Sequence, residues 1–190
     1  MRKMFVLAML VMGMGTYAFA GGYLNLGDDY AVLTNNKLFN SGVSTVSYFN
    51  GSVGAALDCG LIAGLRYDHL GIEDKSFGTE NVRLVAAIPA LELGYYSKLM
   101  DEKLLWWTTA RIGYAVSARY RRGITDYKAT AFVPAVSTAL YYNFVGKFYA
   151  GLEVGYRYFN VKYAGLDSGS NELNLSGIFI GVSFLHFMGK

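Results

Sequence analysis

The clearest pattern in this chain is an alternation of apolar and polar residues with a period of two. Between Leu104 and Arg121 the even-numbered residues are almost all apolar and carry no charge, whereas Arg111, Arg119 and Arg121 are all odd-numbered. Because successive side chains of a strand point to opposite faces, this pattern predicts one long strand with an uncharged face. The predicted strand is longer than most strands of soluble proteins.

The same alternation recurs along most of the chain. Phe148, Leu152 and Tyr156 share one parity, for example, and Glu153 and Arg157 the other. Counting from the C-terminus predicts an antiparallel meander of eight strands, the even number that bacterial barrels use. The predicted strands cover residues 23–33, 44–57, 60–70, 81–97, 104–121, 128–142, 147–163 and 172–187.

The first and last of these strands have ambiguous patterns. Asp28 has the parity of the apolar residues Leu24 and Leu26, so the first strand is expected to bulge or to leave the membrane early there. In the last strand Leu173, Leu175 and Phe179 suggest one inward parity, whereas Ile178, Ile180, Val182 and Phe184 suggest the other. A phase change near Gly177 would reconcile the two halves.

Two prolines lie inside predicted strands. Proline removes a hydrogen bond from a ladder, so a bulge is expected at Pro89 and at Pro134. Arg83 has the opposite parity to Glu92, which a bulge between them would explain. The predicted connections alternate between short turns near Asp58, Asp101 and Asn143 and a second set that is longer on average, as in membrane barrels with short periplasmic turns.

The composition restricts the class of protein. Hydrophobic residues make up 53% of the 190 residues and charged residues only 16%, below the roughly 25% typical of soluble domains. Disorder, a collagen-like repeat and a nucleic-acid-binding tail are thereby excluded. The net charge of +3 includes Arg2 and Lys3, and without them 15 cations face 14 carboxylates. The charge therefore gives no argument for an acidic partner.

The first 20 residues predict a cleaved secretory signal peptide. Arg2 and Lys3 precede an apolar stretch, and Ala18 and Ala20 form a small-x-small cleavage site. A membrane anchor is the alternative, but the apolar stretch is shorter than the roughly 20 residues that a spanning helix needs. Cleavage after Ala20 leaves residues 21–190 as one domain, and Gly21 in place of cysteine argues against a lipoprotein.

Two interpretations fit an exported, apolar chain without a convincing membrane helix: a membrane β-barrel and a soluble secreted β-sandwich. Uncharged strand faces and aromatic residues clustered at strand ends favour the barrel. We therefore predict an all-β fold, an eight-stranded antiparallel up-and-down transmembrane β-barrel. The expected inner-rim belt is Tyr95, Tyr96, Trp106, Trp107, Tyr141, Tyr142, Phe144 and Phe148, and the expected outer-rim belt is Tyr67, Tyr120, Tyr156 and Tyr158.

With these features the mature chain resembles the small eight-stranded outer-membrane barrels, such as the OmpA membrane domain, OmpX and OmpW. The resemblance rests on architecture and covers the whole mature chain. The chain departs from the common pattern at its end, where Phe187 is followed by three further residues. The resemblance implies a bacterial outer-membrane location, contact with outer-membrane lipids and lipopolysaccharide-type lipids, and no nucleic-acid partner. We also expect a monomer.

The inward parity predicts a charged lumen that side chains largely fill. The expected polar network consists of Arg66, Asp68, Glu92, Arg111, Arg119, Arg121, Glu153 and Arg157. The hairpin around Asp101 places Glu92 near Arg111, which suggests an ion pair. The network is either a structural polar core or a narrow, porin-like gated path for small solutes with a positive mouth at Arg119 and Arg121.

Two further function classes remain open. An adhesin would act through residues 72–79 and 166–171, since loops on a rigid scaffold carry recognition. A lipid A-modifying enzyme would need a nucleophile and a base within reach, but His69 and Asp68 are adjacent in a strand and point to opposite faces. His186 lies at the predicted periplasmic end. We therefore predict no enzyme, no cofactor and no metal site, and Cys59 can form no internal disulfide.

Overall fold

The computed structural model describes residues 21–33, 45–74, 82–122, 125–163 and 172–189. The predicted signal peptide and most of the two predicted adhesin loops lie outside these residues. The strands are β1 (Gly21–Leu33), β2 (Thr45–Ala56), β3 (Leu61–Asp74), β4 (Val82–Leu99), β5 (Leu104–Arg122), β6 (Thr125–Val145), β7 (Phe148–Arg157), β8 (Asn160–Lys162), β9 (Glu172–Asn174) and β10 (Gly177–Met188).

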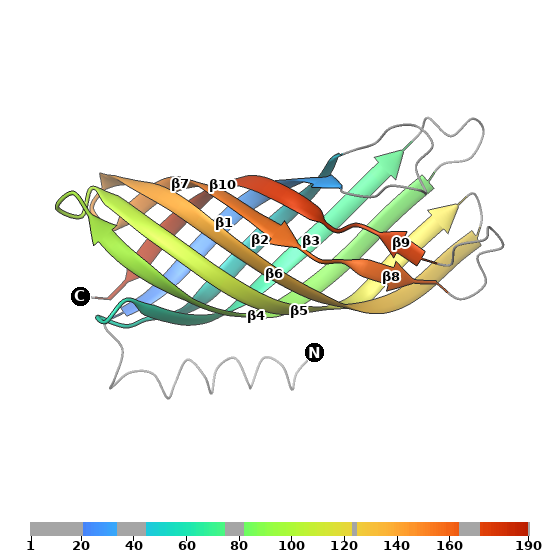
Figure 1. The fold of residues 1–190 in the computed structure, drawn as a ribbon, viewed down its shortest axis with the longest axis horizontal. Helices are drawn as coiled ribbons and strands as arrows, with labels where there is room; N and C mark the ends of the chain where they lie inside the picture. Colours follow the sequence, from blue (N-terminus) through green and yellow to red (C-terminus); the bar gives the residue numbers. More distant parts are fainter. Residues whose placement is uncertain (1–20, 34–44, 75–81, 123–124, 164–171, 190) are drawn as a thin grey trace.

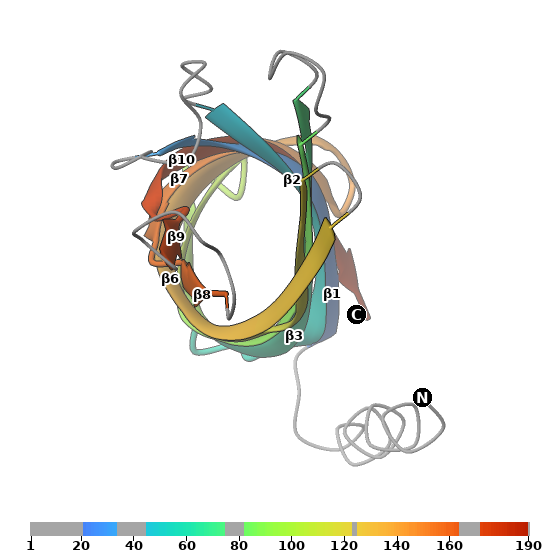
Figure 2. The same cartoon turned by 90° about the vertical axis from the view of Figure 1, so that its right-hand side faces the viewer.

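Eight of the strands form a closed antiparallel barrel in the order β1-β10-β7-β6-β5-β4-β3-β2 (Figure 1). The ring closes where β1 pairs with β10 from Gly22 opposite Met188 to Leu33 opposite Gly177. Figure 2 shows the ring along its axis, with the small β8–β9 sheet at the near rim. The predicted up-and-down barrel is confirmed, including its first strand, and closure pairs each of the eight barrel strands on both sides.

Three tight turns join strands at one end of the barrel, which we call the turn end. They are centred on Asp58, Asp101 and Gly146, and the first and last described residues, Gly21 and Gly189, lie at this end too. The β4–β5 turn places Met100, Asp101 and Glu102 at positive φ, and Lys103 N–H donates to the Met100 carbonyl at 3.2 Å. The opposite end, where β3, β5 and β6 have their other termini, is the loop end.

The last two predicted strands each contain a break. Strand β7 ends at Arg157 and β8 resumes at Asn160, while β9 ends at Asn174 and β10 resumes at Gly177. The parity nevertheless stays constant through the second break, because Leu173, Leu175 and Phe179 are all buried and Ile178 is exposed. The ambiguity of the last strand is thereby resolved, and no phase change occurs near Gly177. Apolar residues occupy both faces because this part of the lumen is itself apolar.

Strand β5 carries one extra residue near Val116. Ala115 and Ala118 face Ala131 and Ala129 of β6, so two residues of β5 oppose one of β6. The pairing with β4 shifts at the same level, between Ala87 and Ala90. A single bulge in β5 explains both shifts, since a bulge adds one residue and reverses the parity beyond it.

The bulge expected at each proline is thus confirmed only in part. A register shift does lie beside Pro89, but the extra residue belongs to β5. Pro134 stays in register opposite Ile112. Its carbonyl accepts from Tyr158 N–H just beyond the end of β7, so its missing N–H falls where the β6–β7 ladder stops.

The outward face of the barrel is apolar over most of its height. Leu91, Leu93, Ile112, Phe132 and Leu152 are each more than half exposed, although they are large hydrophobic side chains. Such a continuous apolar surface would be unstable in water and argues against the soluble sandwich. The described part of the chain contains no helix long and apolar enough to cross a membrane.

Asp28 lies on this outward face without a bulge. Strand β1 keeps a continuous register with both neighbours across this residue, so the bulge, one of the two expected alternatives, is absent. The carboxylate is only partly exposed and accepts a hydrogen bond from Ser47 Oγ at 3.1 Å. A neighbouring strand therefore satisfies the one outward acid of β1.

Candidate functional site

The candidate site is a layer of seven charged side chains that crosses the middle of the barrel. We call it the charge layer; each member is at most 4% exposed. It comprises Arg66, Arg111, Arg157, Asp29, Asp68, Glu92 and Glu153. Isolated buried charges are very costly, so such a layer is stable only when each charge has partners.

Arg66 is the central cation of the charge layer. Its Nη2 lies 2.9 Å from Asp29 Oδ2, and its Nε lies 2.8 Å from Asp68 Oδ1. Its Nη1 lies 3.6 Å from Glu153 Oε2 and 3.8 Å from Glu92 Oε2. One guanidinium from β3 therefore contacts four carboxylates from four strands, which the fork geometry of arginine permits.

Arg157 contacts two of these four carboxylates from the other side of the barrel. Its Nη2 lies 3.1 Å from Asp68 and 3.5 Å from Asp29. Its guanidinium lies 3.9 Å from the centre of the Tyr48 ring and 5.1 Å from that of Phe179. These aromatic faces stabilise the cation at the boundary between the charge layer and the apolar residues that fill the lumen toward the loop end.

Arg111 pairs with Glu153, not with Glu92. The two groups lie 2.7 Å apart, and Arg111 Nη2 also donates to Ser137 Oγ at 2.8 Å. Glu92 is directly opposite Arg111 in the register, as predicted, but accepts instead from the Tyr23 hydroxyl at 2.8 Å. The expected Glu92–Arg111 ion pair is therefore wrong: the arginine reaches across β6 toward β7 and away from β4.

A double-mutant cycle tests this reassignment. We expect Arg111→Met and Glu153→Gln to show a coupling energy of about 2 kcal/mol, because each removal leaves the other charge buried. Arg111→Met with Glu92→Gln should show a much smaller coupling, since Glu92 keeps its hydrogen bond to Tyr23. The quantity to measure is the free energy of unfolding in urea; a larger coupling for the Glu92 pair would reject the assignment.

Two facing glycines make room for Tyr23 beneath the charge layer. Gly54 and Gly64 are directly opposite each other on β2 and β3. A Cβ on Gly54 would lie 2.7 Å from the Tyr23 ring, and one on Gly64 would overlap the Tyr23 hydroxyl and lie 2.7 Å from the Val53 carbonyl. The absence of two side chains therefore lets Tyr23 reach Glu92.

We expect Gly64→Ala to lower the free energy of unfolding by about 1–3 kcal/mol, because overpacking would displace Tyr23 from Glu92. Gly71→Ala on the same strand is the matched control, since a Cβ there has no atom within 4 Å. Urea titration of both variants measures the difference. Equal losses in the two variants would contradict the claim that a Cβ at Gly64 destabilises the barrel by displacing Tyr23.

Apolar clusters lie on both sides of the charge layer. Toward the turn end, the Trp107 ring contacts Tyr23 at 5.0 Å, Tyr96 at 6.0 Å and Phe187 at 6.3 Å between ring centres. We call this group, with Tyr141 and Tyr149, the aromatic cluster. Toward the loop end lie buried aliphatic and aromatic residues that include Tyr48, Leu84, Phe159, Leu173 and Phe179. The prediction of a charged lumen thus applies only to its middle.

Six of the eight predicted lumen residues occupy the charge layer, and two do not. Arg66, Asp68, Glu92, Arg111, Glu153 and Arg157 are buried as expected. Arg119 and Arg121 face outward instead, because the β5 bulge reverses the parity beyond Ser117 and turns Ala118 and Tyr120 inward. The predicted positive mouth of the lumen is therefore wrong.

Sequence reasoning also missed Asp29 and misplaced part of the aromatic belts. Asp29 is fully buried, and its inward parity could have been read from Tyr23 and Asn25. Of the predicted inner belt, Tyr96, Trp107 and Tyr141 are inward and the other five are outward. Strict alternation alone could have separated Trp106 from Trp107.

The two histidines lie apart from the charge layer. His69 is exposed on the outward face while its neighbour Asp68 is buried in the lumen, so the predicted opposite orientation is confirmed. His186 stacks on Phe148 with ring centres 4.1 Å apart.

Comparison with known proteins identifies the fold. No protein-family model and no curated protein sequence matches the chain. Among solved structures, Neisserial surface protein A matches with a TM-score of 0.62 and 14% identity over 87% of this chain and 96% of its own. The N-terminal barrel domain of Pseudomonas aeruginosa OprF matches with a TM-score of 0.59 and 13% identity over 90% and 98%.

A third solved structure, the outer membrane protein OprG from Pseudomonas aeruginosa, matches with a TM-score of 0.56 and 10% identity, covering 91% of this chain and 98% of its own. At such low identities the likeness concerns the fold. The chain therefore has the fold of the small eight-stranded outer-membrane β-barrels, and the resemblance drawn from the sequence is confirmed at that level.

Proposed function

We propose that this chain is an integral outer-membrane protein of the bacterial envelope, whose barrel has a charged and mostly occluded lumen. The outward apolar band supports the membrane location, because an exposed surface of this kind needs a lipid environment. Arg2 and Lys3, followed by an apolar stretch and the small residues Ala18 and Ala20, support export through a signal peptide cleaved after Ala20. The turn end would then face the periplasm and the loop end the outside.

The observation that carries the occluded lumen is the charge layer between two apolar clusters. An ion that entered would have to cross the aromatic cluster around Trp107 and also displace ion pairs of 2.7–2.9 Å. Both steps are costly, the first because apolar constrictions exclude water and the second because paired charges would be separated. We infer that the charge layer is chiefly structural and holds the strands in register.

Slow passage of small solutes remains compatible with this function only if the aromatic cluster moves aside. The contact with outer-membrane lipids and the monomeric state stay predictions, and the adhesin and the lipid A-modifying enzyme stay alternatives. The histidine geometry supports a protein that is not an enzyme, because His69 and Asp68 lie on opposite sides of the wall.

Labelling of the native Cys59 tests the location and the orientation. Cys59 is exposed in the turn between β2 and β3. An impermeant maleimide should leave it unlabelled in intact cells and label it after the outer membrane is permeabilised. A Cys59→Ser, Lys162→Cys variant moves the thiol to the loop end and should be labelled in intact cells. The reverse pattern, or recovery outside the outer-membrane fraction, would contradict the proposal.

A further inference from the structure

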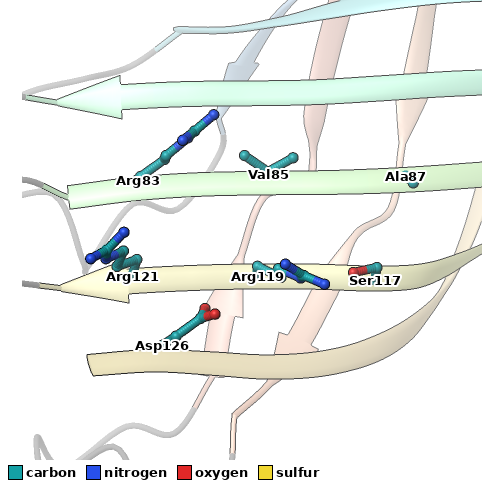
Figure 3. A pocket seen from close by; sticks show the side chains of 7 residues that line it. All are labelled: Arg83, Val85, Ala87, Ser117, Arg119, Arg121 and Asp126. Atoms are coloured by element: carbon teal, nitrogen blue, oxygen red, sulfur yellow. The ribbon is translucent and has the colours of Figure 1, made fainter. Parts of the chain in front are cut away.

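The outward face carries a group of cations that the lumen does not use. Arg83 on β4 and Arg119 and Arg121 on β5 line a shallow depression of about 330 Å³ near the loop end (Figure 3). We call this group the outer arginine cluster. Val85, Ala87, Ser117 and Asp126 complete its lining.

The register places like charges directly opposite one another. Arg83 faces Arg121 across β4 and β5, and Arg119 faces Lys128 across β5 and β6. Like charges in such positions destabilise a sheet, so this arrangement costs stability unless an anion lies between them.

Among the described residues, two carboxylates hold register positions next to these cations. Asp126 is opposite Arg121 and extends toward β5 in Figure 3, and Glu73 holds the register position opposite Arg83. The four cations are Arg83, Arg119, Arg121 and Lys128. With both carboxylates counted, the group keeps an excess of two positive charges. Within the described residues, neither Arg83 nor Arg119 forms a salt bridge, whereas each arginine of the charge layer has at least one carboxylate within 3.1 Å.

The chemistry of the cluster fits a phosphate. Arginine binds phosphate oxygens through paired N–H donors, and several arginines from adjacent strands can share one or two phosphate groups. The Ser117 hydroxyl, which also lines the depression, adds a neutral donor. A dianionic group is a better match than a carboxylate because the excess charge is two.

The surroundings favour a lipid as the carrier of that phosphate. Val85 and Ala87 lie beside the arginines, and the outward face continues toward the turn end with Leu91, Ile112 and Phe132. A phosphate bound at the cluster would therefore have an apolar wall along the direction that an acyl chain takes. Basic residues at the membrane surface next to such a wall recognise anionic headgroups.

We propose that the outer arginine cluster binds the phosphorylated headgroup of an outer-leaflet lipid. This inference rests on the proposed membrane location and orientation, and it deepens that function by naming a lipid class and its site. The headgroup phosphates would lie among Arg83, Arg119 and Arg121, and the acyl chains along β4, β5 and β6.

Native mass spectrometry of the protein extracted from envelopes of cells expressing the full chain tests the proposal. The probes are bis-phosphorylated lipid A, its dephosphorylated form and inorganic pyrophosphate. We expect the phosphorylated lipid to bind about tenfold more tightly than either of the others. Equal binding of the dephosphorylated lipid would overturn the role of phosphate, and equal binding of pyrophosphate would show a soluble phosphate site, contradicting the lipid.

Matched variants locate the binding. The triple variant Arg83→Gln, Arg119→Gln, Arg121→Gln should lose about tenfold in affinity for the phosphorylated lipid. The control Lys98→Gln, Lys103→Gln, Lys147→Gln removes the same charge at the turn end, where all three lysines are exposed, and should keep its affinity. Retained affinity in the triple variant would reject the site.

A second variant and a folding assay separate the causes of failure. Arg83→Gln with Arg119→Gln leaves Arg121 opposite Asp126 and should lose part of the affinity; no loss would reject the cluster. Heat-modifiable gel mobility must be unchanged in every variant, which shows that the barrel is folded. If the maleimide pattern of Cys59 is wrong, the membrane function fails; if it is right and the lipid does not bind, only this inference fails.

Discussion

Replacing Arg66 by methionine is expected to lower the free energy of unfolding of the barrel by about 3–5 kcal/mol. Arg66 contacts Asp29, Asp68, Glu92 and Glu153, so its removal leaves four buried carboxylates with only two arginines. Methionine keeps much of the side-chain volume, so loss of the charge dominates the effect. Urea titration in lipid bilayers, followed by gel mobility and tryptophan fluorescence, measures it.

The controls for Arg66→Met use the rest of the same network and the outer wall. Adding Asp29→Asn should restore part of the loss, because it removes one of the carboxylates that Arg66 had paired. Arg119→Met removes an outward, exposed arginine and should change the free energy of unfolding by less than about 1 kcal/mol. If Arg66→Met were as mild as Arg119→Met, the charge layer would not hold the barrel together.

Replacing Trp107 by alanine should cost about 3–5 kcal/mol of unfolding free energy, since it opens a cavity among packed rings. The Trp107 ring contacts Tyr23, Tyr141 and Phe187 inside the turn end of the lumen. The surrounding strands are held by the closed ladder and cannot collapse to fill the space. The same urea titration measures this loss.

Trp106→Ala is the matched control, because Trp106 is adjacent in sequence but half exposed on the outward face. Its ring Nε1 donates to Thr138 Oγ1 at 2.7 Å, so some loss is expected. We expect this loss to be less than half of that for Trp107→Ala, since lipid can fill the space left outside. Equal losses would mean that the aromatic cluster is not tightly packed.

The architecture could be predicted from sequence because a barrel wall imposes one rule on every strand. Outward residues must be uncharged, inward ones are free to be polar, and a period of two follows. This rule gave the strand order and the short turns. It also gave the inward position of Arg66, Arg111 and Glu153. The first strand, whose pattern is interrupted by Asp28, closes the ring with β10.

The bulge in β5 marks the limit of that rule. One extra residue near Val116 exchanges the two faces, and the sequence conceals it because Ala118 and Tyr120 fit either face. Strict alternation therefore places Arg119 and Arg121 in the lumen. The parity of Arg83 is the sequence feature that points to this bulge. Arg83 has the opposite parity to the inward Glu92, so it lies on the outward face, and Arg121, which it faces across β4 and β5, lies there too.

The ion-pair partners could not be predicted from the sequence, for a different reason. Pairing across a strand follows from register, but Arg66 and Arg111 reach partners on strands that are not their neighbours in the ladder. Contacts through a lumen depend on the tilt and stagger of the whole barrel. The curvature of the barrel wall brings Asp29 of β1 to Arg66 of β3, with β2 between them, and to Arg157 of β7, with β10 between them.

Single-channel recording in a planar bilayer tests the central claim, a lumen closed by the charge layer and the aromatic cluster. The sample is the unmodified protein from cell envelopes, with its folded barrel confirmed by heat-modifiable mobility. The account predicts a silent membrane without discrete current steps at either polarity. Steps whose size rises with salt concentration would show an open aqueous path through the barrel and contradict the account.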